Sequence, residues 1–195
     1  MPDGFALCWR EALALDRRTA PEFYTSVHEV KPGPHAEAIS FALDELGLVA
    51  VFCIEGVPTI GFLNQPDGSL TRIDELHRIL WNQGLMSLLL VLKEDELVAY
   101  SLVKRPFPST ERQESDPRLI VTLSLVSDAL KLRELIASTE SGRFWFENDE
   151  FFNPDDRVDS VLLSNLLVAF KAMRDDLGGE AAQALLMQTM FIAYL

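Results

Sequence analysis

The chain has 195 residues, of which 48% are hydrophobic and 24% charged. This composition predicts a hydrophobic core and excludes a wholly disordered chain. Its net charge of −13 argues against nucleic-acid binding by this chain alone, because affinity for phosphates depends largely on clustered Lys and Arg. Asp3, Arg10 and Glu11 interrupt the region where a signal peptide would be apolar, and no apolar run approaches the roughly 18 residues of a membrane helix. We therefore expect a cytoplasmic protein in which Cys8 and Cys53 are reduced thiols of the core.

The first elements alternate between helix and strand. Residues 1–34 are an N-terminal extension, with a short helix over 5–15 and several prolines that prevent its continuation. Apolar residues at helical spacing then predict a helix over 35–46. The apolar, β-branched run 48–54 predicts a buried strand, and 59–63 returns as its hairpin partner after a turn.

The middle of the chain repeats this order. The spacing of apolar residues predicts a helix that begins near Thr71, its expected N-cap, and ends at Gly84. Residues 87–92 and 97–103 predict a second hairpin around a charged turn. A proline-containing surface loop leads from there to a further strand, over 119–126. Two hairpins with a helix between them indicate a small, mostly antiparallel sheet with covering helices.

The last third of the chain is expected to be helical. A helix over 128–136 precedes an aromatic and acidic segment, 143–156, and two further helices are predicted over 158–173 and 180–195. The final helix is apolar nearly all the way round, and its one neighbour can cover only one stripe of it. We therefore expect Met187, Phe191 or Tyr194 to face outward, giving a surface that docks on structure outside this chain. For the chain alone we expect either self-association through this surface or a frayed, mobile C-terminus.

These elements define an α+β fold followed by a helical segment. The expected organisation is an N-terminal extension (1–34), an α+β domain (35–126) and a helical segment leading toward a catalytic domain outside this chain (127–195).

The chain carries no recognisable catalytic or metal-binding motif. His28-Glu29 begins like a zinc-protease helix, but Pro32 stands where the second histidine is required. Metal-dependent nucleases of the restriction type need an acidic residue on one strand and an acidic-x-Lys on the next. The one Glu-x-Lys, Glu29-Val30-Lys31, precedes the predicted core.

Two polar groups of residues are candidates for contact with a partner or with DNA. Trp81, Asn82 and Gln83 close the predicted middle helix, and Arg157 and Asp159 flank the start of a later one. We favour a structural interpretation for both groups. Trp81 would be mostly buried between its helix and the sheet, and carboxylates are stabilising at the positive end of a helix. The alternative is that the tryptophan and the amides stack on a base or contact a ligand, and that Arg157 pairs with a partner.

Three blocks of sequence carry a resemblance to a known family. Together they resemble the region ahead of the catalytic domain in large adenine-specific DNA methyltransferases of restriction-modification and phage-defence systems. The blocks are distinctive in their order, but none is a catalytic signature. They are residues 76–84 with the hairpin that ends near Tyr100, the aromatic residues Phe144-Trp145-Phe146 with Phe151-Phe152, and residues 157–166 with 190–195.

The resemblance implies that the whole protein uses S-adenosylmethionine to methylate the exocyclic amine of adenine, after flipping the base from the duplex. The family's Asn/Asp-Pro-Pro-Tyr/Phe motif is absent, because the segment beginning Asn153-Pro154 lacks the second proline and the aromatic residue. No catalytic residue and no cofactor site can therefore be assigned to this chain. We expect a non-catalytic N-terminal module that positions DNA, a partner subunit or the catalytic domain. A degenerate or cryptic restriction-type nuclease domain, and a free-standing interaction protein of a defence operon, stay open as alternatives.

Overall fold

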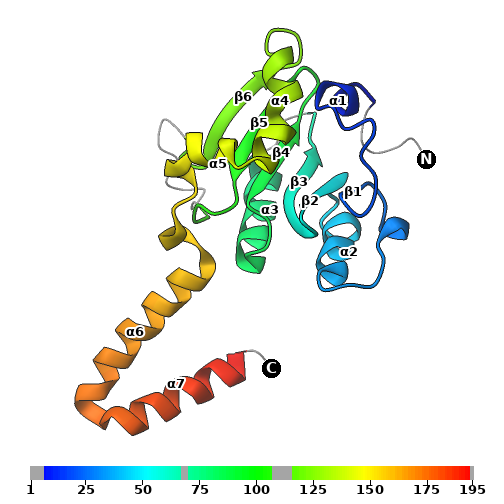
Figure 1. Cartoon of the computed structure of the whole chain (residues 1–195). Coiled ribbons are helices and arrows are strands. Elements are labelled where there is room, and N and C mark those ends of the chain that lie inside the picture. The colour runs from blue at the N-terminus through cyan, green and yellow to red at the C-terminus, as the bar shows by residue number, and fades with distance from the viewer. Residues whose placement is uncertain (1–6, 67–69, 107–115, 194–195) are drawn as a thin grey trace.

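Six strands lie side by side in one sheet, in the order in which they follow one another along the chain (Figure 1). The computed structural model describes residues 7–66, 70–106 and 116–193, with side chains of the last helix described through Thr189. All neighbouring strands are antiparallel except β3 and β4, which confirms an α+β fold with a mostly antiparallel sheet. The strands are β1 (Phe23–Tyr24), β2 (Ala50–Ile54), β3 (Val57–Asn64), β4 (Leu88–Leu92), β5 (Glu96–Ser101) and β6 (Leu119–Ser124).

The connections follow from local geometry. Glu55 and Gly56 join β2 to β3 with φ values of 52° and 81°, the backbone of a two-residue hairpin turn that matches the twist of the strands. The parallel pair β3 and β4 needs a crossover, which is provided by α3 (Leu70–Gln83). Because α3 begins at Leu70, Thr71 lies inside the helix, and its expected role as the N-cap was wrong.

Helices cover both faces of the sheet (Figure 1). One face packs against α2 and α3, and the other against α1, α4 and α5. Successive residues of a strand point to opposite faces, so β4, with all five residues buried, contributes to both cores. The remaining helices are α1 (Leu7–Ala12), α2 (Ala36–Asp44), α4 (Ala129–Glu140), α5 (Arg143–Glu147), α6 (Val158–Leu177) and α7 (Gly179–Ala193), with short 3-10 turns η1 (Val27–Glu29), η2 (Asp149–Phe151) and η3 (Pro154–Asp156).

The N-terminal part of the chain packs on the sheet. β1 pairs with β2, and Trp9 and Leu13 are buried in the same core as α4. Trp9 lies in α1 and Leu13 directly follows that helix, and both side chains are buried, whereas Cys8 is exposed. The expectation of a core thiol was therefore wrong for Cys8 and correct for Cys53, whose pKa burial raises to about 11.

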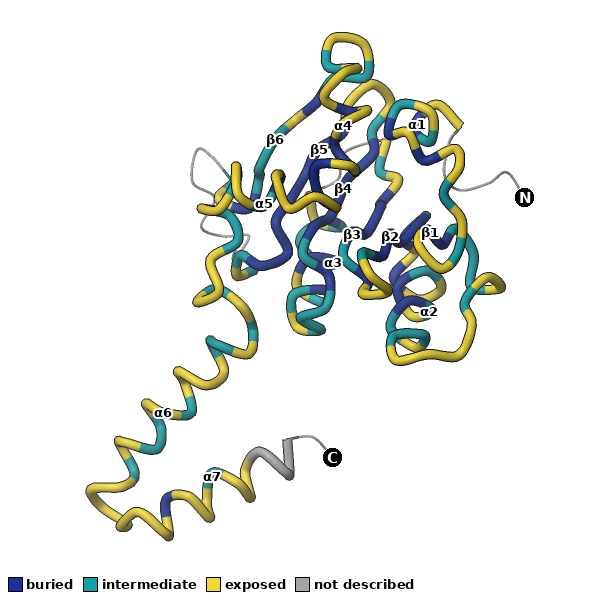
Figure 2. Tube along the Cα trace, in the orientation of Figure 1, coloured by how far each residue is buried: buried dark blue, intermediate teal, exposed yellow. Residues whose placement is uncertain are grey.

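The two C-terminal helices form a hairpin that projects from the sheet domain (Figures 1 and 2). No residue of α6 is buried, and α6 packs mainly against α7. Met187 is exposed as expected, whereas Phe191 and Tyr194 lie outside the described side chains. No helix in the described part of the chain is both long and apolar enough to cross a membrane.

Candidate functional site

The predicted contact residues Trp81 and Arg157 meet where α6 leaves the domain. The Nε1–H group of Trp81 donates to the carbonyl oxygens of Val103, at 3.1 Å, and of Asp156, at 3.0 Å. Arg157 Nη2 lies 3.4 Å from the carbonyl oxygen of Gly84, which ends α3 with a φ of 65° as predicted. This junction therefore ties the end of α3 and the end of β5 to the start of α6.

Charged side chains strengthen the same junction. Lys104 Nζ lies 3.0 Å from a carboxylate oxygen of Asp156, and Arg105 Nε lies 3.9 Å from the other. Asp156 is thus held through its backbone by Trp81 and through its carboxylate by two cations. The residues that lead into α6 are therefore anchored at several points, whereas α6 itself has no buried residue.

Trp81 is partly buried, which agrees with the expectation of a mostly buried side chain, but it is not among the residues packed in the core between α3 and the sheet. It stands at the end of α3, where α6 covers it only in part, rather than under the sheet. The crevice that it lines with Arg157 and Val158 has a volume of about 10 Å³, room for one water molecule at most. The indole therefore joins elements of the protein and leaves no space there for a base or a ligand.

The remaining predicted contact residues are Asn82, Gln83 and Asp159. Asn82 is exposed and Gln83 half-buried, and neither side chain has a hydrogen-bond partner among the described residues. Arg157 pairs with Asp159 at 3.3 Å, in the first turn of α6. The backbone N–H of Ser160 donates to the Asp159 carboxylate and, together with Arg157, lowers its pKa. Asp159 lies in the first turn of α6, the position expected for a carboxylate that stabilises the start of a helix.

A buried ionic cluster was not found from the sequence. Arg118 is only 4% exposed, and its Nη2 contacts Asp74 at 2.6 Å and Asp116 at 2.7 Å. Burial by itself lowers the pKa of the Arg118 guanidinium, but hydrogen bonds to both carboxylates raise it above its ordinary value. Burial likewise works against ionisation of Asp116, and the bonds from Arg118 outweigh it and lower its pKa.

His77 belongs to the same buried region. Its Nε2 lies 2.8 Å from the carbonyl oxygen of Ser101, and its Nδ1 has no hydrogen-bond partner. Burial lowers the pKa of His77 to about 4, and the charge of nearby Arg118 acts in the same direction. The imidazole is therefore neutral at pH 7, and its Nε2–H group donates a hydrogen bond to the carbonyl oxygen of Ser101. Ser101 Oγ in turn donates to the carbonyl oxygen of Phe151 at 2.7 Å, which ties β5 to the aromatic segment.

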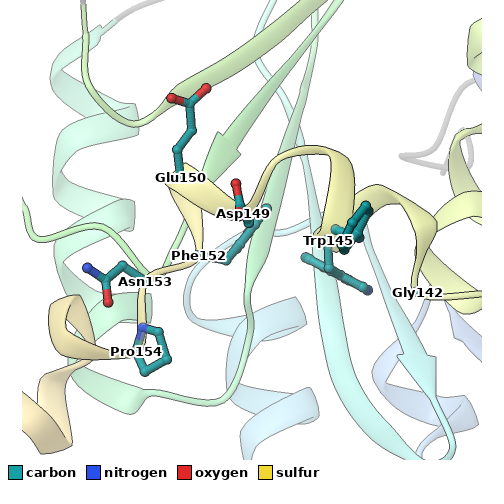
Figure 3. A pocket seen from close by; sticks show the side chains of 8 residues that line it. Gly142, Trp145, Asp149, Glu150, Phe152, Asn153 and Pro154 are labelled. Carbon is teal, nitrogen blue, oxygen red and sulfur yellow. The ribbon is translucent and has the colours of Figure 1, made fainter.

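An open groove follows the aromatic and acidic segment ahead of α6 (Figure 3). It has a volume of about 910 Å³. The floor is held by Trp145 and Phe152, whose ring centroids are 4.8 Å apart. Phe146, 83% exposed, lies at its border with the carboxylates of Asp149 and Glu150. Sequence analysis noted the composition of this segment, but not that it lines a groove.

The potential metal ligands of the described residues are dispersed. No group of three or more His, Cys, Asp or Glu among them is placed to share a metal ion. The carboxylate of Glu29, from the one Glu-x-Lys, accepts the backbone N–H groups of Thr25 and Ser26 and caps η1. Among the described residues, the six strands contain one charged residue, Glu96.

Comparisons of the chain with protein-family models, curated proteins and solved structures found no match.

Proposed function

We propose that this chain is a non-catalytic docking module of an adenine-specific DNA methyltransferase, of the restriction-modification or phage-defence type. In this proposal the sheet domain is the rigid base. The hairpin of α6 and α7 binds the S-adenosylmethionine-dependent domain or a partner subunit, which contacts the DNA.

The apolar surface of the hairpin carries the proposal. Leu163 and Leu167, one helical turn apart on α6, are 60% and 50% exposed, and Val168 is 66% exposed. On α7, Leu185 is 44% and Met187 64% exposed. Large exposed aliphatic side chains on two adjacent helices are of the kind that marks a protein interface.

The shape of the hairpin supports docking on another helical element. Two helices joined at Gly178 cannot cover each other on all sides, and a stable helical bundle has additional helices on its open face. The family that the sequence resembles continues through such a bundle. The chain's net charge of −13 makes a protein surface a better partner for this module than the phosphates of DNA.

The restriction-type nuclease is the second candidate. The order α2, β2, β3, α3, β4, with helices on both sides of the sheet, is compatible with that type of fold. A metal-dependent centre needs carboxylates on adjacent strands, and β2 and β3 contain no charged residue. These observations favour an inactive relative over a working nuclease, and such a relative could still serve as the base of a docking module.

Co-purification tests the docking proposal. The full chain is co-expressed with the S-adenosylmethionine-dependent domain encoded in continuation with it or beside it, and complex formation is measured by sedimentation. We expect a complex that Leu163→Gln together with Leu167→Gln weakens at least about tenfold, since two central apolar contacts are lost. Ser164→Gln together with Lys171→Gln is the matched control, because both of these residues are exposed on α6.

Two outcomes would contradict the proposal. If no such domain is encoded with the chain, the free-standing interaction protein becomes the better interpretation. If the complex forms but the two leucine substitutions act no more strongly than the control pair, docking does not use the hairpin.

A further inference from the structure

The groove beside the base of α6 combines an aromatic floor with exposed carboxylates. Asp149 and Glu150 are exposed, and neither has an ion-pair partner in the described part of the chain. Figure 3 shows Trp145, Phe152 and Asp149 along the lining, with the carboxylate of Glu150 reaching out at its border. The site is therefore acidic at its border and aromatic along its floor.

The aromatic floor is preorganised. The Nε1–H group of Trp145 donates to the carbonyl oxygen of Thr139 at 2.8 Å, which fixes the orientation of the indole. Phe152 meets Trp145 edge-on at an interplanar angle of 81°. Phe144, 6% exposed, contacts both rings from the core. Rings that are held in this way lose little conformational freedom when something packs on them.

We propose that this groove binds an arginine side chain carried by an exposed segment of a partner protein. A guanidinium stacks on aromatic rings, is attracted by the negative faces of those rings and forms strong hydrogen bonds with carboxylates. It is also more weakly hydrated than the ammonium group of lysine, so it loses less on entering a groove with an apolar floor.

Charge complementarity sets the class of partner. Asp149 and Glu150 repel phosphate groups, as does the net charge of the whole chain, so stacking of a nucleic-acid base on Trp145 or Phe152 is disfavoured. The groove is wide and open, which suits a side chain on a protein surface better than an enclosed small molecule. It ends at Pro154, shortly before α6, so one partner could contact both the groove and the hairpin.

The test uses the three tryptophans as reporters in the full chain. Each indole N–H is hydrogen-bonded to a different carbonyl group, so the three give distinct nitrogen-15 NMR signals. The probe is a capped Gly-Arg-Gly-Arg-Gly peptide, compared with the same peptide carrying neutral citrulline in place of arginine. We expect the arginine peptide to shift the Trp145 signal saturably, with a Kd on the order of 1 mM or below. Trp9 should be unaffected, and the citrulline peptide should be at least about five times weaker.

Substitutions locate the contact. Asp149→Asn together with Glu150→Gln should weaken binding about tenfold, since both charge-assisted contacts are lost. Phe146→Ala should weaken it about threefold without loss of stability, because this ring is 83% exposed. Asp175→Asn together with Asp176→Asn removes the same charge from α6 and should change the Kd less than twofold.

The proposal is independent of the methyltransferase assignment, because binding is measured on this chain alone. It is overturned if the Trp145 signal does not move, if citrulline binds as well as arginine, or if the control pair weakens binding as much as the groove pair. A short DNA duplex that shifts the Trp145 signal and displaces the peptide would also overturn it, and would assign the groove to nucleic acid.

Discussion

Protonation of His77 should control the stability of the fold at mildly acidic pH. The imidazole is fully buried, faces the carbonyl oxygen of Ser101 and lies close to the ionic cluster of Arg118, Asp116 and Asp74. Its pKa is about 4 in the folded protein, against 6.5 ordinarily. Between these values the unfolded chain binds more protons than the folded one, so stability falls as the pH is lowered.

The magnitude follows from the two pKa values. The contribution of neutral His77 is fully present above about pH 6.5 and is lost as the pH falls toward 4. Between the two pKa values the free energy of unfolding changes by about 1.4 kcal/mol per pH unit. Lowering the pH from about 7 to about 5 crosses most of this range and removes about 2 kcal/mol. Asp116 and Asp159 keep their charge over this range, because their pKa values are lowered rather than raised.

Urea unfolding at pH 7 and pH 5 measures the effect. The control is His77→Gln, which keeps an N–H donor for Ser101 but cannot be protonated in this range. The other two histidines are present in both proteins, and their effects cancel in the comparison. We expect the wild-type chain to lose about 2 kcal/mol more than the variant between these pH values. Equal losses would show that His77 is hydrated or has a proton acceptor in the folded state, and the reasoning from burial would fail.

Three further changes test the packing. Arg118→Leu should cost about 3 kcal/mol in urea unfolding, because it leaves Asp74 and Asp116 without their shared cation, and a loss below 1 kcal/mol would contradict the ionic cluster. Gly61→Ala should cost about 1–2 kcal/mol, because the new Cβ would lie 2.8 Å from a methyl group of Leu48. Gly179→Ala, into open space, is the control and should cost nothing. Trp81→Phe should cost about 1 kcal/mol and speed hydrogen exchange in the first turn of α6, since the indole donor to Val103 and Asp156 is lost. Unchanged exchange there would show that other contacts hold the junction.

The elements that could be predicted from the sequence are those with their own local signal. The run 48–54 and the turn after it identify the first hairpin, because an apolar, β-branched run and turn chemistry act over a few residues. β1 was missed because two residues, Phe23 and Tyr24, carry no periodicity, and only pairing with β2 makes them a strand. The parallel contact of β3 with β4 is likewise a property of the crossover and not of either strand.

The site residues divide in the same way. Gly84 and Asp159 act within a turn of their own helix, so their roles were readable from spacing. Arg118 and Asp74 are 44 residues apart and meet only because α3 and the start of β6 lie side by side, which no local pattern encodes. The partial burial of Trp81 depends on a helix that begins 77 positions later in the chain. The local sequence therefore predicted the roles of these residues within their own helices, whereas their long-range contacts depend on the tertiary fold.

The hairpin of α6 and α7 is not part of either hydrophobic core of the sheet domain. Both faces of the sheet are covered by α1 to α5, and neither buried core includes a residue of α6 or α7. Its exposed leucines therefore contribute no burial to this fold, whereas their exposure to water is unfavourable. The base of α6 is nevertheless fixed by Trp81, by Arg157 and by the cations around Asp156, so the hairpin leaves the domain in a defined direction. A surface that is apolar and already oriented loses less entropy when it binds, and this combination of features is what a docking arm requires.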